Sequence, residues 1–286
     1  MKEILEVALP EGSVRMTRLD KTGGPVLKYP GSKWRLAPWI ISHLPPHQVY
    51  LEPFFGGGAV LFNKPPSALE TVNDLDSDVV NLFRVMREQP DELARLISLT
   101  PFAREEFYLC HEKTGVPLED ARRFLVQIWQ GFAGRTSSPS GWAHFRCAIK
   151  GGDLAARFSR VPERILATAH RLKHVQIECL PALELIPKHK SKEVLIYADP
   201  PYPLATRTGG KMYKHEMTDG DHVQLLAMLN DHPGPVVLSG YACDLYKDAL
   251  VGWSMVTRRQ TTQQGVQKEE SLWLNPAANS KTKGIF

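Results

Sequence analysis

The stretch L-E-P-F-F-G-G-G-A-V-L-F, Leu51–Phe62, decides the fold that we expect for this chain. It begins as a short apolar run, passes through three consecutive glycines and continues into residues that suit a helix. Glycine adopts positive φ and lets a ligand approach the backbone, and a helix N-terminus favours anionic groups. Strand, glycine turn and helix in this order are typical of α/β sheets that bind nucleoside cofactors. A tight turn with a purely structural role is the competing interpretation.

The next apolar run ends in V-N-D, at Asp74. An acid at the end of the second strand of such a unit accepts hydrogen bonds from ribose hydroxyls. The third glycine of the dinucleotide fingerprint is missing, because Leu61 stands three residues after Gly58. The pattern therefore disfavours NAD and leaves room for S-adenosylmethionine.

Seven short runs rich in β-forming residues recur along the chain, most of them bounded by Gly, Pro, Asn or Asp. They begin at Val49, Glu70, Val175, Val194, Pro235, Ser254 and Ser271. Between them we expect helices over Ser32–Leu44 with Ser32 as the cap, from Asp76 or Ser77 onward, and from Asp219 onward. This alternation predicts an α/β fold with a largely parallel sheet.

The middle of the chain differs, because Pro90 to about His170 shows helical patterns and no convincing buried strand. Within it, Gly131–Arg146 is rich in Gly, Ser, aromatic residues and arginine, which predicts an exposed loop or hairpin. We therefore expect a core of residues 25–90 and 171–286, an inserted recognition subdomain of residues 91–170, and a flexible extension of residues 1–24.

Charge is distributed unevenly, although the formal net charge is only +4. The window Ala121–Lys173 holds ten basic and two acidic residues, so it carries +8 and the remainder carries −4. A basic segment on a mildly acidic body favours an anionic polymer as partner, and a solvated helix face is the alternative. The 286-residue chain has no apolar run near the ~18 residues of a membrane helix and no signal-peptide pattern. Its four cysteines form no C-x-x-C pair, so we expect no disulfide framework, no metal site and a cytoplasmic location.

The run that starts at Val194 ends in Y-A-D-P-P-Y, Tyr197–Tyr202. The Asp199 carboxylate and the Pro200 carbonyl can accept the two N–H hydrogens of an exocyclic amine and aim its lone pair at a methyl donor. Tyr202 can stack on a base taken out of a duplex. The alternative is a turn that ends a strand and carries a packed tyrosine.

These motifs together resemble the Dam-type family of DNA adenine-N6 methyltransferases, found in bacteria and their phages, over roughly Leu27–Pro276. K-Y-P-G-S-K, E-P-F-F-G-G-G, V-N-D-L-D-S-D and D-P-P-Y follow one another in the order of the alpha group, and T-P-F-A-R-E-E-F and K-E-E-S-L-W-L-N-P are also similar. The resemblance implies a seven-stranded Rossmann-like sheet, S-adenosylmethionine as cofactor and a monomer. It places seven residues at or beside the cofactor: Tyr29, where the family usually has Trp, and Lys33, Phe54, Gly56, Gly58, Asp74 and Asp199.

Double-stranded DNA is the partner that this resemblance implies. We expect contacts with DNA from three places: the start of the basic window, the Gly131–Arg146 loop within it and the loop after D-P-P-Y. The residues are Arg122 and Arg123, then Arg135, Trp142 and Arg146, then Arg207, Lys211 and Lys214. Arginines of the Gly131–Arg146 loop can read guanine in the major groove, and contact with phosphates alone is equally compatible. We expect the loop Pro203–His215 to order over the substrate strand.

Several other functions remain open from the sequence. An amino-methyltransferase can act on cytosine N4, on RNA adenine or on protein glutamine; Asp199 favours adenine. A relative that binds DNA without turnover is disfavoured by the intact D-P-P-Y. A nicotinamide-dependent oxidoreductase is disfavoured by the missing glycine. The recognition sequence, and a role in restriction-modification, protection from restriction or regulation, are not decided.

Overall fold

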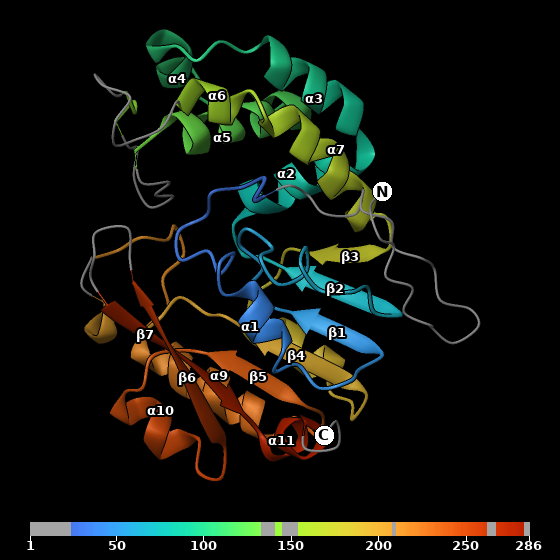
Figure 1. Cartoon of the computed structure of the whole chain (residues 1–286), viewed down its shortest axis with the longest axis vertical. Helices are drawn as coiled ribbons and strands as arrows, with labels where there is room; N and C mark the ends of the chain where they lie inside the picture. Colours follow the sequence, from blue (N-terminus) through green and yellow to red (C-terminus); the bar gives the residue numbers. More distant parts are fainter. Residues whose placement is uncertain (1–23, 133–140, 145–153, 208–209, 262–266, 283–286) are drawn as a thin grey trace, which may run out of the picture.

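The computed structural model describes residues 24–132, 141–144, 154–207, 210–261 and 267–282. Its centre is a seven-stranded sheet in the order β3-β2-β1-β4-β5-β7-β6 (Figure 1). The strands are β1 Val49–Glu52, β2 Leu69–Asn73, β3 Val175–Glu178, β4 Val194–Ala198, β5 Val236–Ser239, β6 Ser254–Thr261 and β7 Gln267–Leu274. The first five are parallel, and β7 runs antiparallel to both β5 and β6. Each of the seven expected runs overlaps one strand, so the expected sheet is confirmed.

The strand order reverses at β1, which lies between β2 and β4. In the register of the sheet, Leu51 of β1 is opposite Ile196 of β4, so the two strands end side by side. Ligands of open α/β sheets bind at the carboxyl ends of strands where the order reverses. The glycine turn after β1 and the Asp-Pro-Pro-Tyr segment after β4 therefore meet at one edge of the sheet.

Side chains of the buried strands alternate between the two faces of the sheet, and each face has its own apolar cluster. Tyr50 and Tyr197 belong to the cluster that includes the helix after β2, whereas Leu51 and Ile196 belong to the cluster that includes the helix before β5. The helices outside the middle region are α1 Ala37–Ile41, α2 Ser77–Glu88, α8 Ala182–Leu185, α9 Asp219–Asn230, α10 Asp244–Ala249 and α11 Pro276–Thr282. This cover on both faces explains why all five residues of β4 are buried.

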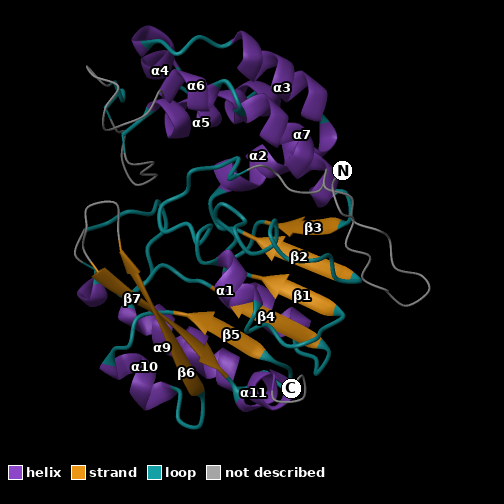
Figure 2. Cartoon of the chain, in the orientation of Figure 1, coloured by secondary structure: helices purple, strands orange, loops and turns teal. Residues whose placement is uncertain are grey.

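The middle region is helical and gathers beyond the β3 edge of the sheet (Figure 2). Its helices are α3 Pro90–Leu99, α4 Arg104–Leu109, α5 Pro117–Gln130, α6 Leu154–Phe158 and α7 Val161–Leu172. Three of them, α3, α5 and α7, pack on α2, and Arg171 of α7 donates to both oxygens of Glu70 in β2, at 2.5 and 2.8 Å. Lys64 binds the same carboxylate at 2.6 Å, so a buried ion cluster joins this layer to the sheet. The division of the chain into a core and an inserted subdomain stays a prediction.

Two helices begin differently from the sequence expectation. Ser32 does not cap a helix, because α1 starts only at Ala37, with Pro38 in its first turn, the place where proline is tolerated. After the glycine turn, residues 59–63 form successive turns instead of a helix, and Pro65 and Pro66 follow without N–H donors. No helix N-terminus faces a ligand at this turn. Asp76 caps α2 and Asp219 is the first residue of α9, as expected.

Candidate active site

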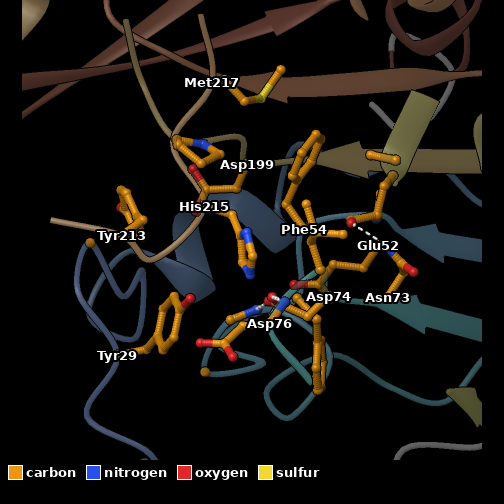
Figure 3. A pocket seen from close by; sticks show the side chains of 18 of the residues that line it. Tyr29, Glu52, Phe54, Asn73, Asp74, Asp76, Asp199, Tyr213, His215 and Met217 are labelled. Atoms are coloured by element: carbon orange, nitrogen blue, oxygen red, sulfur yellow. Dashed lines mark hydrogen bonds between the residues drawn. The ribbon is translucent and has the colours of Figure 1, made fainter. Parts of the chain in front are cut away.

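A cavity of about 240 Å³ lies at the carboxyl ends of β1, β2 and β4 (Figure 3). Its walls come from the K-Y-P-G-S-K segment, the glycine turn, the end of β2, the start of D-P-P-Y and the later loop over residues 213–217. Six of the seven residues expected at the cofactor line it: Tyr29, Lys33, Phe54, Gly56, Asp74 and Asp199. Segments far apart in the sequence therefore converge where the topology predicts a ligand.

Gly58 is the exception, because it supports the turn instead of lining the cavity. Its φ is +65°, and a Cβ there would lie 2.3 Å from Phe62 and 2.6 Å from Phe55. A larger residue would collide with both rings. Gly58 thus packs beneath the turn, and its expected contact with the cofactor stays a prediction.

The Asp74 carboxylate holds the glycine turn in place. It accepts hydrogen bonds from the backbone N–H groups of Gly56, at 2.7 Å, and Asp76, at 2.9 Å. Burial raises the pKa of Asp74 to about 6, although these N–H donors favour the charged form. Each oxygen receives one of these two bonds, and carboxylate oxygens can accept more, so Asp74 can bind the hydroxyls of a ligand in the cavity.

An aromatic wall stands across the cavity from the β2 end. A Cβ on Gly56 would lie 2.8 Å from the ring of Tyr29, so only glycine lets the turn pass this ring. Tyr213 of the later loop lies 6.0 Å from Tyr29 between ring centroids. Figure 3 shows His215 between these rings and Phe54, pointing into the cavity. Flat aromatic surfaces of this kind suit a purine ring.

Lys33 and Asp199 form an ion pair at the end of β4. The Lys33 Nζ lies 3.1 Å from Asp199 Oδ1, with side-chain exposures of 8% and 19%, and it also donates to the Gly31 carbonyl at 3.0 Å. Burial lowers the pKa of Lys33, but the charges of Asp199 and Glu270 outweigh it, so the pKa ends above its ordinary value. Burial raises the pKa of Asp199, and Lys33 opposes that rise. The Lys33 ammonium thus favours the ionised form of a half-buried carboxyl beside the cavity, against the effect of burial.

Tyr202 lies next to this pair, under the Lys33 ammonium. The Lys33 Nζ is 4.7 Å from the ring centroid, and the Tyr202 hydroxyl donates to Glu270 in β7 at 3.1 Å. The ring of Tyr241, after β5, makes a T-shaped contact with the Tyr202 ring, with centroids 4.8 Å apart. Tyr202 and Pro200 are both buried and stand outside the cavity lining. A pocket for a ligand, a charged acceptor and a fixed aromatic ring thus meet at the ends of β1 and β4.

Comparison with known proteins gives this arrangement a family. Residues 29–264 match the family profile of the D12 class N6 adenine-specific DNA methyltransferases. The chain belongs to that family. It therefore methylates adenine in DNA, with S-adenosylmethionine as the methyl donor. The cavity fits this cofactor, because it joins an aromatic wall to the Asp74 carboxylate at the sheet edge where nucleoside ligands bind.

Curated relatives agree with the family at modest identity. A DNA adenine methylase of Serratia marcescens is 26% identical over 239 residues, covering 78% of this chain and 85% of that protein. A type II methyltransferase of Lactococcus lactis subsp. cremoris is 28% identical over 248 residues, covering 78% and 84%. Among solved structures, TrmN from Thermus thermophilus aligns with a TM-score of 0.38 and 16% identity, covering 84% of this chain and 48% of that one.

The methyltransferase has one buried carboxyl in this cavity that the sequence did not single out. Glu52, 2% exposed at the end of β1, accepts a hydrogen bond from the Tyr50 hydroxyl at 2.9 Å. Burial raises its pKa to about 8, and the charge of Asp199 adds to the effect. Glu52 is therefore mostly protonated at neutral pH. The sequence signal that could have found Glu52 is its position as the first residue of E-P-F, just before the glycine turn.

The loop after D-P-P-Y folds back on itself and on the cofactor cavity. The Arg207 guanidinium, 7% exposed, binds the Tyr202 carbonyl and pairs with Glu216 at 2.8 Å. Lys214 bridges Asp76 and Asp78 at the mouth of the cavity, at 3.0 Å each. These contacts give Arg207 and Lys214 structural roles, so their expected contacts with DNA stay predictions that this geometry does not favour. Lys211 is exposed.

The other expected DNA contacts divide in the same way. Arg122 pairs with Glu106 at 2.6 Å and Glu119 at 2.7 Å, and Arg123 pairs with Glu119 at 2.7 Å. Both guanidiniums thus hold α5 to its neighbours, and contact with DNA stays a prediction for them. Arg135 and Arg146 lie outside the described residues.

Trp142 lies at the base of the Gly131–Arg146 loop, where a backbone bridge joins it to Gly131. Its ring stacks on His144 at 5.3 Å, and the Arg104 guanidinium lies 4.9 Å from the ring centroid. The described base of this loop is therefore hairpin-like, and a cation and two rings gather there. Contact with DNA stays a prediction for Trp142.

Two further properties concern only the described part of the chain. Its residues include no group of three or more His, Cys, Asp or Glu side chains that can hold a metal ion. None of its helices has the length and apolar character needed to cross a membrane.

Proposed function

We propose that the methyltransferase transfers the methyl group to N6 of an adenine turned out of double-stranded DNA, and that Asp199, Pro200 and Tyr202 carry the step. The observation that carries the proposal is the ion pair of Asp199 with Lys33 at the end of β4, between the cofactor cavity and the ring of Tyr202. In the reaction the sulfonium–methyl bond breaks and the N6–methyl bond forms. The proton that N6 then loses leaves to solvent, so the balance needs no further reactant.

Asp199 supplies the charge that the reaction lacks. The N6 lone pair of adenine is delocalised into the ring, so the amine is a poor nucleophile. Asp199 and the Pro200 carbonyl accept its two N–H hydrogens, which favours a tetrahedral nitrogen with its lone pair directed at the methyl. Lys33 stabilises the ionised form of Asp199, the form that accepts the stronger hydrogen bond.

The cofactor is held, in this proposal, by the residues that converge on the cavity. Asp74 accepts the ribose hydroxyls, and Tyr29 packs against the adenine ring of the cofactor with Phe54 opposite. Gly56 lets the backbone turn approach the ligand, since its φ of +49° suits glycine. When bound, S-adenosylmethionine supplies an electrophilic methyl group, and the protein orients it toward the Asp199 carboxylate.

DNA contact, in this proposal, uses cations of the helical layer and the half-buried Lys28 beside it. Arg157 of α6 is exposed, and Lys28 and Arg164 both lie over the buried indole of Trp129, at 3.9 and 5.1 Å from its centroid. Burial, together with Arg157 and Arg164, lowers the pKa of Lys28 to about 8. Crowded cations of this kind suit a phosphate backbone. We propose further that residues 91–170 form the recognition subdomain and that the enzyme acts as a monomer in the cytoplasm.

The test uses purified protein, methyl-labelled S-adenosylmethionine and unmethylated double-stranded DNA. Wild type, Asp199→Ala and the control Asp248→Asn, an exposed acid on α10, are assayed together, and the DNA is digested to nucleosides. N6-methyladenine from wild type and the control, and none from Asp199→Ala, is the expected result. Label on cytosine overturns the target, and DNA binding without any label overturns the enzyme in favour of a binding relative.

A further inference from the structure

One carboxylate in β7 binds two tyrosine hydroxyls beside the active site. Glu270 accepts from Tyr202 through Oε2 at 3.1 Å and from Tyr241 through Oε1 at 3.3 Å. The rings of Tyr202 and Tyr241 meet edge to face, with centroids 4.8 Å apart and planes at 71°. The three side chains thus form a closed cluster in which each contact fixes the direction of another.

The sheet topology explains why these residues meet. Tyr202 follows β4, Tyr241 follows β5 and Glu270 lies in β7, and these strands are neighbours in the sheet. Beyond the last pair of β5, the Gly240 N–H still donates to the Ser271 carbonyl at 3.1 Å, which brings Tyr241 beside Glu270. The K-E-E-S-L-W-L-N-P segment, which resembles the family motif, therefore has a definite place near the chemistry.

The cluster determines how the ring of Tyr202 lies. A tyrosine ring turns about two side-chain torsions, and a base can stack on it only when its face has a defined direction. Glu270 holds the hydroxyl end through a charge-assisted hydrogen bond, and Tyr241 packs against the ring in a T-shaped contact. Lys33 lies over the ring at 4.7 Å, so the cluster also sets the distance between the ring and the Lys33–Asp199 pair.

We infer that Glu270, with Tyr241, is a positioning residue for methyl transfer: it orients Tyr202 so that the target adenine stacks with N6 at Asp199. This inference rests on the proposed function, whose role for Tyr202 it deepens. Glu270 acts through Tyr202 and touches neither substrate nor cofactor.

The β6–β7 hairpin does not depend on this carboxylate for its fold. Its backbone pairing runs from Ser254 opposite Leu274 to Thr261 opposite Gln267, and Glu270 is only half-buried. Replacement of Glu270 therefore removes its hydrogen bond with Tyr202 and leaves the sheet in place. Glu269, exposed and next in the same strand, offers a matched control.

The experiment measures kcat and KM for DNA and for S-adenosylmethionine in Glu270→Ala, Glu270→Gln, Tyr202→Phe, the double variant Glu270→Ala/Tyr202→Phe, and the control Glu269→Ala. Misplacement of a reacting group by about 1 Å costs about 100-fold in rate, so we expect Glu270→Ala to lower kcat by about 10- to 100-fold. KM for S-adenosylmethionine stays within about twofold, since the cofactor cavity is unchanged. The control variant retains wild-type constants.

The double variant separates positioning from a general structural effect. If Glu270 acts through the Tyr202 hydroxyl, both single changes remove the same interaction. The kcat of the double variant is then no more than about twofold below that of the less active single variant. Independent effects that multiply overturn the inference. Glu270→Gln keeps an acceptor for that hydroxyl, so it restores part of the activity, and a Gln variant as impaired as Ala also overturns it.

Base position provides a second measurement that does not depend on turnover. With 2-aminopurine at the target adenine, the fluorescence increase on binding reports the base outside the stack, and we expect a smaller increase for Glu270→Ala at equal DNA saturation. An unchanged increase together with unchanged kcat overturns the inference alone. Absence of N6-methyladenine from wild type overturns the proposed function instead, so the two failures are distinguishable.

Discussion

The ammonium of Lys33 lies 3.1 Å from the Asp199 carboxylate and 4.7 Å from the centroid of the Tyr202 ring. These are the two contacts that the proposed mechanism assigns to the target base, an N–H donor on Asp199 and a partner over Tyr202. Before a base arrives, Lys33 thus opposes the rise that burial causes in the pKa of the Asp199 carboxyl. Lys33, which we expected at the cofactor, lines the cavity and also serves the catalytic motif.

Replacement of Lys33 by Met should move the pH dependence of the enzyme. Burial already raises the pKa of Asp199, and removal of the opposing ammonium raises it further. Since the ionised carboxylate is the active form, the acidic limb of kcat/KM shifts to higher pH. Below the new pKa, activity falls about tenfold for each pH unit, because the ionised fraction of the carboxyl falls by that factor. A pH–rate profile with Lys33→Arg as the charge-preserving control checks this; a Met variant with reduced rate and an unmoved limb contradicts it.

Cofactor binding should depend on the ionisation of Asp74. Its pKa is raised to about 6, and its ionised form is the stronger acceptor for ribose hydroxyls. The affinity for S-adenosylmethionine therefore falls as pH drops through about 6, and Asp74→Asn binds about 10-fold or more weakly, with no such pH dependence. Titration calorimetry between pH 5 and 8 measures both. An Asn variant that keeps the pH dependence would assign it to another group.

The buried ion cluster under β2 should contribute to stability. Glu70 is 2% exposed and is bound by both Lys64 and Arg171, so Glu70→Gln leaves two cations without a full partner. Breaking a buried pair costs about 3–5 kcal/mol, which we expect as the decrease in free energy of unfolding in urea. The pKa of Glu70 is lowered by these partners, so its stabilisation is present above its ordinary value of 4.5 and is lost as pH falls through the lowered value. Glu92→Gln is the control and should change stability little, because the Glu92 side chain is 45% exposed and its pair with Arg95 lies at the surface.

Sequence reasoning succeeded where a local pattern decides the structure. Short β-rich runs, most of them bounded by Gly, Pro, Asn or Asp, located all seven strands, and Asp76 capped its helix, because both signals act within a few residues. It failed at Ser32, since a proline six residues later limits where α1 begins. Charge counting did not reveal the pairing of Arg122, whose partners Glu106 and Glu119 lie on a neighbouring helix and on its own.

Residues that meet only through sheet order were beyond local patterns. Glu270 and Tyr241 reach Tyr202 because β4, β5 and β7 are neighbours, and no spacing in the sequence reports that order. Glu52 was overlooked for a related reason. Its carboxyl faces the cavity only once β1 is buried between β2 and β4.

The ion pairs of Lys214 with Asp76 and Asp78, at the start of α2, should control cofactor exchange. Lys214 bridges Asp76 and Asp78 at the mouth of the cavity, and the loop that carries it contributes Tyr213 and Met217 to the lining. Lys214→Ala frees this loop, so we expect S-adenosylmethionine to dissociate several-fold faster with little change in its association rate. Stopped-flow displacement measures the two rates, and Lys211→Ala, in the same loop and exposed, is the control. Equal dissociation rates in wild type and Lys214→Ala would show that these ion pairs do not control cofactor exchange.

Replacement of an exposed cation should weaken DNA binding, whereas replacement of a cation paired within the protein should not. Arg157 of α6 is exposed, whereas Arg122 is engaged with Glu106 and Glu119. Each phosphate that the protein no longer neutralises reduces the slope of log affinity against log salt concentration by about 0.9. We therefore expect Arg157→Gln to reduce this slope by about one and to leave thermal stability unchanged, and Arg122→Gln to lower the unfolding temperature with an unchanged slope. Fluorescence anisotropy with duplex DNA from 50 to 200 mM salt, an interval over which phosphate neutralisation changes affinity strongly, measures the slopes. The opposite pattern would return Arg122 to the DNA interface and give Arg157 a structural role.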